Sequence, residues 1–180
     1  MTVEHYLGLA RAGVLAEDDR VELLEGVVVA MTPRNPPHDS CVTRVGLALQ
    51  RAVAERAVVR TLCALIAGAH SMPEPDVAVV PGCVADYDHR HPETALLVFE
   101  VADASLAQDR LAKAGIYAAA GIPEYWIANL REGALEVRRE PEREQARYRE
   151  LRTLRPGERV ELAALPGAVV AVAELLPGLR

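Results

Sequence analysis

Lysine is almost absent from this 180-residue sequence: 19 of its 20 basic residues are arginine, and Lys113 is the only lysine. Aromatic residues are also few, at 4%, and the three cysteines (Cys41, Cys63 and Cys83) form no C-x-x-C pair. An odd number of widely spaced cysteines argues against a disulfide framework or a zinc site, so we expect reduced thiols. No apolar run approaches the roughly 20 residues that a membrane-spanning helix needs, so we expect no membrane association.

Positive charge is in deficit as well. The net charge of −6 argues against a protein that holds nucleic acid mainly through a broad basic surface. Residues 1–100 carry 8 Arg against 14 acidic residues, whereas residues 131–180 carry 10 Arg against 9 Glu. We therefore expect any phosphate-facing surface in the last third of the chain, although such an Arg/Glu mixture is also typical of a solvated, salt-bridged face.

The remaining composition indicates a globular protein. A hydrophobic share of 51% with mixed charges excludes a disordered chain, and 180 residues suffice for one well-buried core. We therefore predict a single domain over residues 1–180. The first residues, MTVEHYLGLARAG, have no basic segment before an apolar stretch, so they do not resemble a secretory signal, and we expect a cytoplasmic location.

The first half of the chain predicts two helices, a hairpin and three strands. Thr2 to Ala12 is typical of a short helix capped by Thr2, and two apolar runs on either side of Glu25-Gly26 indicate a hairpin. Apolar residues at helical spacing predict a longer helix over roughly His38–Arg56. Strand-like apolar runs then occupy Val58–Cys63, Asp76–Val80 and Ala95–Ala102.

The second half predicts a crossover followed by short strands. Residues 106–120 indicate a helix stopped by Gly121 and Pro123, and Glu124–Leu130 indicates a buried strand. Strand, helix and strand in this order predict a βαβ crossover and a partly parallel sheet. The runs ALEVRRE, ARYRELRT and ERVEL predict an antiparallel meander, and AVVAVAELL closes the chain. The fold class is therefore α/β, with a mixed central sheet flanked by helices and an additional antiparallel meander.

Two carboxylates fall on neighbouring apolar strands. Asp76 opens DVAVV and Glu100 lies inside ALLVFEVA. An ionised Glu in an apolar strand is costly unless it is paired or bound to a metal. The two-residue period of a strand places Leu96, Val98, Glu100 and Ala102 on one face and Leu97, Phe99 and Val101 on the other. Asp76 taken alone fits a turn-capping carboxylate equally well.

The single lysine follows on the next helix. Asp109 and Lys113 are spaced i, i+4, and a right-handed crossover brings this helix back over the sheet, within reach of the carboxylates. Lysine differs from arginine most at a catalytic position, because its compact ammonium has a pKa that burial can lower. Two oxygen ligands and a cation suit magnesium-assisted phosphate chemistry. For Asp109 we favour the simpler interpretation, an ordinary i, i+4 partner of Lys113.

The ordered motifs resemble a known family. PDVAVV (75–80), LLVFEVADAS (96–105) and DRLAKAGIYAAAGIPEYWIANL (109–130), together with VELLEGVVVAMTP (21–33) and His38, are similar to the bacterial family of putative restriction endonucleases, a branch of the PD-(D/E)XK nuclease superfamily. The similarity covers nearly the whole chain. It implies a restriction-endonuclease-like fold and a metal-dependent endonuclease that uses Mg²⁺ or Mn²⁺ and acts on nucleic acid, with DNA as the expected polymer.

The resemblance also implies roles for single residues. Asp76 and Glu100 match the metal-binding acids, and the backbone carbonyl of Val101 is a further expected ligand. The superfamily's usual lysine, two residues after the acid, would fall at Ala102; in this branch it has moved to the following helix, where Lys113 matches it. Glu22 and His38 resemble additional polar positions that line the site, with a helix-capping role for His38 equally open.

Two functions remain open on this basis. One is a metal-dependent nuclease, favoured by the complete Asp, Glu and Lys set. The other is a non-catalytic interaction or regulatory domain that keeps the fold with its carboxylates in ion pairs, favoured by the acidic balance. We also expect a homodimer, because small nucleases commonly need two sites for two strands and AVVAVAELL offers apolar surface beyond what one small core must bury.

Overall fold

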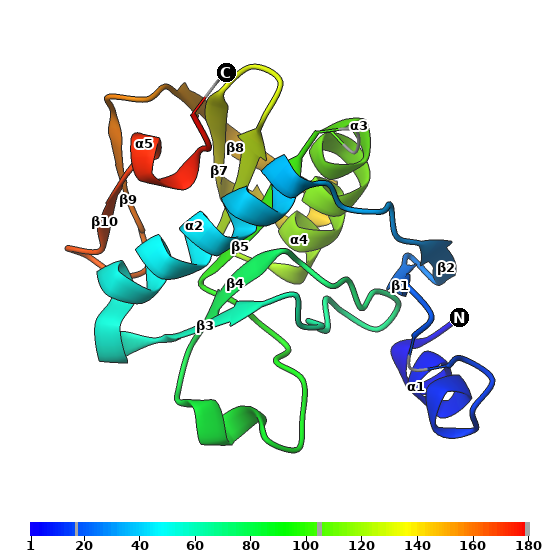
Figure 1. Cartoon of the computed structure of the whole chain (residues 1–180). Coiled ribbons are helices and arrows are strands. Elements are labelled where there is room, and N and C mark those ends of the chain that lie inside the picture. The colour runs from blue at the N-terminus through cyan, green and yellow to red at the C-terminus, as the bar shows by residue number, and fades with distance from the viewer. Residues whose placement is uncertain (17, 104–105, 179–180) are drawn as a thin grey trace.

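A six-stranded mixed sheet forms the centre of the protein, in a computed structural model that describes residues 1–16, 18–103 and 106–178 (Figure 1). The end of the motif LLVFEVADAS, residues 104–105, lies outside the described residues. Neighbouring strands are antiparallel except for the parallel pair β5 and β6, which confirms the predicted crossover and the mixed α/β class. The spatial order follows the sequence: β3 (Val58–Thr61), β4 (Val77–Val80), β5 (Leu97–Ala102), β6 (Glu124–Asn129), β7 (Ala134–Glu142) and β8 (Arg147–Leu154).

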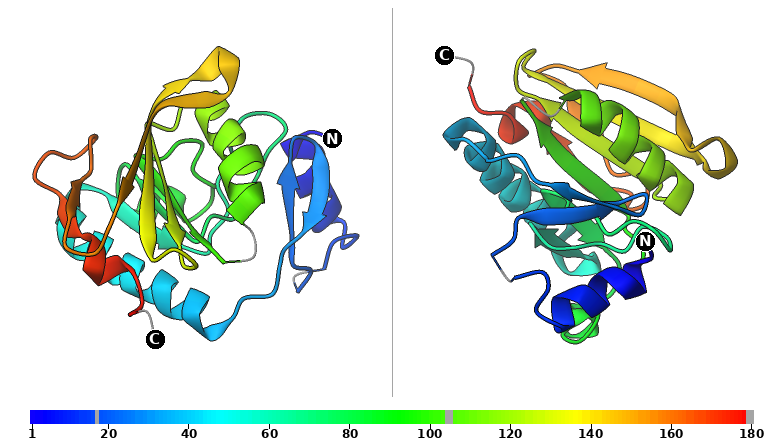
Figure 2. Two further views of the ribbon diagram at one scale, coloured as in Figure 1. Left: turned by 90° about the horizontal axis from the view of Figure 1, so that it is seen from above. Right: turned by 90° about the vertical axis from the view of Figure 1, so that its right-hand side faces the viewer.

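Helices cover both faces of this sheet, with α2 (Pro36–Val53) on one side and α4 (Ala114–Ala120) on the other (Figure 2). Helix α2 begins two residues earlier than predicted. Proline is well suited to the first helical position, because its missing N–H would have no partner there, and Asn35 caps the helix by accepting a hydrogen bond from the His38 N–H. The helix ends at Val53, and a 3₁₀ turn (Ala54–Arg56) follows it.

The crossover between β5 and β6 is not one regular helix. Helix α3 (Leu106–Gln108) leads into a π-helical turn, Asp109–Lys113, before α4 begins. A π turn bonds residue i to i+5 and therefore shifts the faces that following residues present. As predicted, the helix stops at Gly121, whose φ of 79° places it in the left-handed conformation that ends many helices.

The N-terminal segment lies beside the sheet without joining it. Helix α1 (Val3–Arg11) is capped by Thr2 as predicted, and β1 (Val21–Leu24) and β2 (Val27–Ala30) form a separate hairpin. The turn residues Glu25 and Gly26 both have positive φ, 49° and 83°, as the preferred two-residue hairpin turn requires.

The C-terminal strands differ from the predicted meander. Strands β7 and β8 extend the central sheet, whereas β9 (Arg159–Glu161) pairs with β10 (Val169–Ala171), and the short helix α5 (Val172–Leu175) follows. Val170, Val172 and Leu175 are buried in the core beside α2. Most of the apolar surface on which we based the expectation of a homodimer is therefore covered within the chain.

The two faces of β5 pack in different cores. Its odd-numbered residues, Leu97, Phe99 and Val101, pack with α2, whereas Val98 and Ala102 pack on the side of α4. Glu100 alternates with the second set, as predicted. Leu96 precedes the strand and packs with the first core, because the period of two begins only at Leu97. No helix in the described ranges is long and apolar enough to cross a membrane.

Candidate active site

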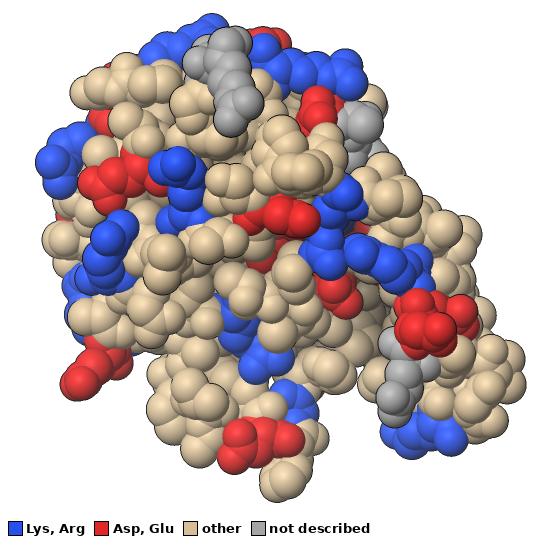
Figure 3. Space-filling view, viewed as in Figure 1, with Lys and Arg blue, Asp and Glu red and all other residues tan. Residues whose placement is uncertain are grey.

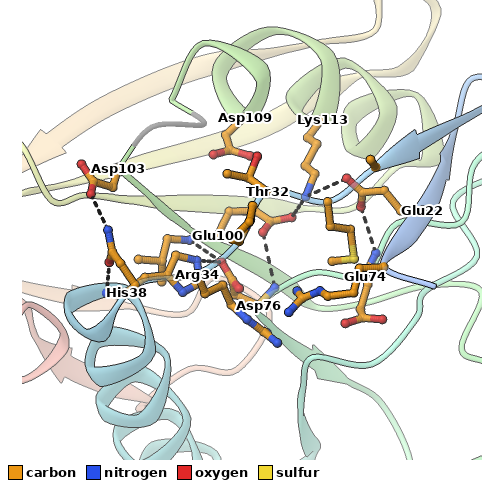
Figure 4. Close-up of a pocket in the computed structure, with 16 residues that line it drawn as sticks. Glu22, Thr32, Arg34, His38, Glu74, Asp76, Glu100, Asp103, Asp109 and Lys113 are labelled. Atoms are coloured by element: carbon orange, nitrogen blue, oxygen red, sulfur yellow. Dashed lines mark hydrogen bonds and ion pairs between the residues drawn. The ribbon is translucent and has the colours of Figure 1, made fainter. Parts of the chain in front are cut away.

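A small pocket lies at one end of the sheet, where β4 begins and β5 ends (Figure 4). The two strands are antiparallel, so the start of one is adjacent to the end of the other. The other walls come from the β1–β2 hairpin, the connection between β2 and α2, the first turn of α2 and the π-helical turn. Its volume is about 100 Å³. This space admits a few water molecules or a phosphate group, but it is well below the ~300–1,000 Å³ of pockets that enclose a small-molecule ligand.

Asp76 and Glu100 meet in this pocket because of the strand register. Val77 pairs with Phe99, and one further step along the ladder places Asp76 opposite Glu100. Directly opposed residues have Cβ atoms about 4.5–5.5 Å apart. The Asp76 N–H also donates to Oε2 of Glu100 over 3.4 Å. Both residues are buried, at 7% and 3% exposed, although each carries a carboxyl group.

Lys113 lies between two carboxylates rather than on the helix surface. Its Nζ is 3.0 Å from Oε1 of Glu100 and 3.5 Å from Oε1 of Glu22. Asp109 is also buried, at 3% exposed, and lines the same pocket as Lys113. Burial alone would lower the pKa of Lys113, but the carboxylates of Glu100, Glu22 and Asp109 outweigh it and raise the pKa. Lys113 is therefore held as an ammonium ion.

Glu22 and His38 both line the pocket, as the sequence suggested. Glu22 projects from β1, and its Oε2 accepts a hydrogen bond from the Glu74 N–H at 3.2 Å. His38 is the third residue of α2, and its Nε2 is 3.2 Å from Oδ2 of Asp76. The His38 backbone N–H donates to the side chain of Asn35, which caps the helix. His38 therefore takes part both in the start of α2 and in the wall of the pocket.

Val101 contributes backbone rather than side chain. Its N–H donates to Oδ2 of Asp76 at 2.8 Å, and the residue lines the pocket. The N–H and C=O of one residue in a strand point to the same side, so the Val101 carbonyl also faces the beginning of β4. Val101 therefore presents its backbone to the strand edge beside Asp76.

Tyr117 is a site residue that the sequence analysis missed. Its hydroxyl donates to Oε1 of Glu100 at 2.9 Å, and the ring is fully buried against Tyr125. Burial, together with the charge of Glu100, raises the pKa of the Tyr117 hydroxyl well above its usual range. The spacing i, i+4 from Lys113 was a usable signal, because it places both residues on one helix face.

The carboxyl group of Glu100 has a strongly shifted pKa. Burial raises its pKa well above the usual range, and Lys113 only partly opposes this, while Asp76, Asp109 and Glu22 raise the pKa further. The cause is an excess of negative charge in a space largely closed to water. The buried carboxylates therefore favour an additional cation.

The charges around the pocket are unbalanced. Six acidic side chains line it against three basic side chains, a formal excess of three acidic groups. The acidic residues are Glu22, Glu74, Asp76, Glu100, Asp103 and Asp109, and the basic residues are Arg20, Arg34 and Lys113. Neither lining arginine comes from the last third of the chain, contrary to our expectation for a phosphate-facing surface, because the β1–β2 hairpin and not the C-terminal strands lies beside β4 and β5.

Across the described ranges, no group of three or more His, Cys, Asp or Glu side chains is arranged to hold a metal ion by itself. The pocket offers two adjacent carboxylates and a backbone carbonyl instead. Mg²⁺ is commonly bound by one or two carboxylates together with waters and substrate phosphates. The donor set of Asp76, Glu100 and Val101 fits that pattern and does not fit a metal that needs four side-chain ligands.

Comparison with known proteins gives one family and one fold. The family model Uma2, described as "Putative restriction endonuclease", matches residues 3–173. A solved structure from Anabaena variabilis, described as a "putative nuclease belonging to DUF820", is similar with a TM-score of 0.77 over 97% of both chains. Sequence identity to that protein is 14%, so this likeness concerns the fold. No curated protein matches the chain significantly.

Proposed function

This chain belongs to the Uma2 family of putative restriction endonucleases, and we propose that it is a metal-dependent nuclease that hydrolyses phosphodiester bonds in nucleic acid. The family confirms the resemblance drawn from the sequence motifs. The proposed metal is Mg²⁺, with Mn²⁺ as its substitute, and the proposed polymer is DNA. One observation carries the proposal: Asp76, Glu100 and Lys113 line a single pocket whose size suits a phosphate group.

The proposed metal ligands are Asp76, Glu100 and the carbonyl of Val101. All three offer the oxygen atoms that Mg²⁺ prefers. A bound Mg²⁺ would lower the pKa of a coordinated water and neutralise charge that develops on the phosphate. The excess negative charge of the pocket supports a cation there, because Lys113 alone does not balance the carboxylates around it.

The remaining residues would orient these groups. Lys113, held as an ammonium ion between Glu22 and Glu100, is proposed to position the attacking water through hydrogen bonds rather than to remove its proton. His38 would hold Asp76 from the side of α2, and Tyr117 would hold Glu100 from the side of α4. These contacts fix both carboxylates before substrate arrives, which reduces the reorganisation that binding requires.

The alternative is a non-catalytic interaction or regulatory domain. Every proposed catalytic side chain already has a partner inside the protein: Glu100 has Lys113, Asp76 has His38 and Glu22 has Lys113. A fold that had lost its activity would be stabilised by such pairs. The two functions differ in metal binding, which only the nuclease requires.

A nuclease screen tests the proposal. Single-stranded, double-stranded and branched DNA and the matching RNA would be incubated with Mg²⁺, Mn²⁺ or Ca²⁺, with wild type beside Asp76→Asn and Lys113→Arg. We expect cleavage by wild type with Mg²⁺ or Mn²⁺ and its loss in both variants. Wild-type cleavage that persists in Asp76→Asn would reveal a contaminant, and no cleavage under any condition would favour the alternative.

Three further proposals concern the whole molecule. We propose that residues 1–180 act as one domain and that the protein works in the cytoplasm, where the free thiols Cys41, Cys63 and Cys83 would stay reduced. A homodimer is proposed from the need to cut two strands, no longer from the C-terminal apolar segment. Sedimentation at micromolar concentration, with and without DNA, measures it directly; monomer in both conditions would exclude it.

A further inference from the structure

The pocket is too small to hold a nucleotide. Its volume of about 100 Å³ accommodates the phosphate that would be cleaved, so the adjoining nucleotides of the substrate must lie outside, across the rim. The residues of the rim therefore decide where the strand runs. This argument rests on the proposed nuclease function of the same pocket.

Arg20 and Arg34 form one part of this rim. The Met31 N–H donates to the Arg20 carbonyl at 2.8 Å, so Arg20 lies at the base of the β1–β2 hairpin, close to the segment that carries Arg34. Both arginines line the pocket, and Arg34 points into it beside Asp76 and Glu74 (Figure 4). Figure 3 shows a band of basic side chains on this face between the hairpin and α2, with acidic side chains on either side.

A second hollow begins on the other side of these arginines. Its volume is about 520 Å³, and it shares Arg20, Met31, Pro33 and Arg34 with the pocket. Its remaining walls are Asp39, Val42, Thr43 and Leu62. This size lies in the range of small-molecule sites, and apolar and hydroxyl-bearing walls suit a sugar and a base. The two hollows are thus neighbours with the arginines between them.

Both guanidinium groups lie near the carboxylate of Glu74, whose pKa burial raises and their charges lower, and both keep donors that a phosphate can use. The ion pair of Arg34 with Asp39 is long, at 3.9 Å, and Asp39 is 64% exposed, so the pair is weak. Nη1 of Arg34 is buried and has no hydrogen-bond partner among the described residues. Arg20 is exposed and forms no ion pair with any residue in the described ranges. Arginine binds phosphate through two parallel hydrogen bonds. Neither Arg20 nor Arg34 makes such a two-fold contact with a carboxylate in the described ranges.

We propose that Arg20 and Arg34 bind the phosphate adjoining the scissile one, so that the substrate strand leaves the pocket over these two arginines and enters the hollow between α2 and the β2–α2 connection. The chain as a whole is acidic, and this contact needs no broad basic surface. In this proposal the strand binds because two arginines lie at the point of contact. The two arginines together should then account for about one phosphate contact in the salt dependence of binding.

The test measures binding of a labelled oligonucleotide, the best substrate of the screen, with Ca²⁺ in place of Mg²⁺ and salt varied from about 50 to 200 mM. Arg20→Gln and Arg34→Gln are each expected to weaken binding about three- to tenfold, and the double variant should reduce the slope of log affinity against log salt by about 0.7–0.9, the change for one phosphate. Arg34→Lys keeps the charge but loses the planar guanidinium that makes two parallel hydrogen bonds. This variant should therefore keep the slope and lose affinity. Arg149→Gln, an exposed residue of β8 paired with Glu140, is the matched control and should change neither.

An oligonucleotide with one uncharged linkage in its sugar-phosphate backbone shows which phosphate the arginines contact. Replacing the adjoining phosphate by a methylphosphonate should weaken binding by wild type and by Arg149→Gln but not by the double variant Arg20→Gln/Arg34→Gln, because that variant has already lost both contacts to this phosphate. Wild-type slope and affinity in both glutamine variants, with equal melting temperatures, would overturn this inference and leave the nuclease function standing. A wild type that neither binds nor cleaves nucleic acid would instead overturn the proposed function together with the inference.

Discussion

Tyr117 donates a hydrogen bond of 2.9 Å to Oε1 of Glu100, the same oxygen that accepts one of 3.0 Å from Lys113. Both donors come from one face of the crossover helix. The other oxygen, Oε2, receives the long contact of 3.4 Å from the Asp76 N–H. Oε1 is thus held by the helix, whereas Oε2 is directed to Asp76 and is the oxygen that a shared cation would take.

Tyr117→Phe should weaken activity without loss of the fold. The change removes one of two hydrogen bonds to Oε1 of Glu100, and bonds to charged groups contribute about 1.5–3 kcal/mol. If part of this free energy stabilises the transition state, the cleavage rate should fall about 3- to 30-fold, since 1.4 kcal/mol corresponds to tenfold. Cleavage rates and Mn²⁺ affinity by calorimetry would be measured together.

Tyr148→Phe is the matched control for that substitution. Its hydroxyl donates at 2.9 Å to the carbonyl of Ile122, which does not line the pocket. A similar loss of stability is expected, but cleavage per folded molecule and Mn²⁺ affinity should stay at wild-type values. Equal effects of the two substitutions on metal affinity would mean that Tyr117 acts only through stability.

Lys113→Arg should abolish most activity, by about 10²–10⁴-fold. Lys113 is 7% exposed between Glu22 and Glu100, so a planar guanidinium does not fit without displacing one carboxylate, at a cost of about 1–3 kcal/mol in stability. Arg110→Lys, the reverse exchange on the same helix at a 39% exposed position, is the control. We expect it to keep cleavage within threefold. Near wild-type cleavage by Lys113→Arg, measured beside thermal melts, would remove Lys113 from the mechanism.

Much of the site was predictable because it depends on short-range patterns. The strands of Asp76 and Glu100 follow from apolar runs, and their proximity follows from the antiparallel pairing of consecutive strands. The order strand, helix, strand also placed Lys113 on a helix that returns over the sheet. Each of these inferences needs only local sequence and the chirality of the connection.

The remaining features depend on packing that no local pattern encodes. Asp109 and Lys113 are buried at the two ends of the π-helical turn, and nothing in their spacing separates this turn from a regular helix. The hairpin that carries Glu22 makes a backbone pairing with the segment before β4, through Leu23 and Met72. That docking places Arg20 and Arg34 at the pocket, although the first hundred residues are the most acidic part of the chain.

Acid should destabilise the protein through Glu136. Burial alone would raise its pKa, but hydrogen bonds from Arg110 and Asn129 outweigh burial and lower the pKa below the usual value. Its stabilisation is therefore fully present above the unfolded pKa of about 4.3 and is lost as pH falls through the lower folded pKa. Glu136→Gln should cost about 1–3 kcal/mol at pH 7 and should flatten the fall in stability below about pH 4.5.

Urea denaturation at a series of pH values measures that effect. Glu140→Gln provides the comparison, because Glu140 and its partner Arg149 are 53% and 68% exposed. Such a pair contributes about 0–1 kcal/mol, so this variant should follow the wild-type pH profile. An unchanged profile in Glu136→Gln would show that other carboxylates govern acid unfolding.

Metal binding gives the most direct test of the site. If Asp76 and Glu100 share one cation, wild type should bind a single Mn²⁺, and Asp76→Asn should lose at least tenfold in affinity although the amide can still accept from the Val101 N–H. Glu74→Gln is the matched control: Glu74 lines the same pocket but is not a proposed ligand, so its affinity should stay within threefold of wild type. Calorimetry measures both constants.

Binding of Mn²⁺ at the site should also raise the stability of the folded protein. A ligand present at 100 times its dissociation constant stabilises the folded state by about 2.7 kcal/mol, so Mn²⁺ should raise the melting temperature of wild type and of Glu74→Gln but not of Asp76→Asn. Because the cation would relieve the repulsion between two adjacent buried carboxylates, the rise should exceed that produced by equal ionic strength of a monovalent salt. If Mn²⁺ shifts all three proteins equally, the ion acts by general screening. The carboxylates would then be tied only to Lys113 and His38, as the non-catalytic alternative requires.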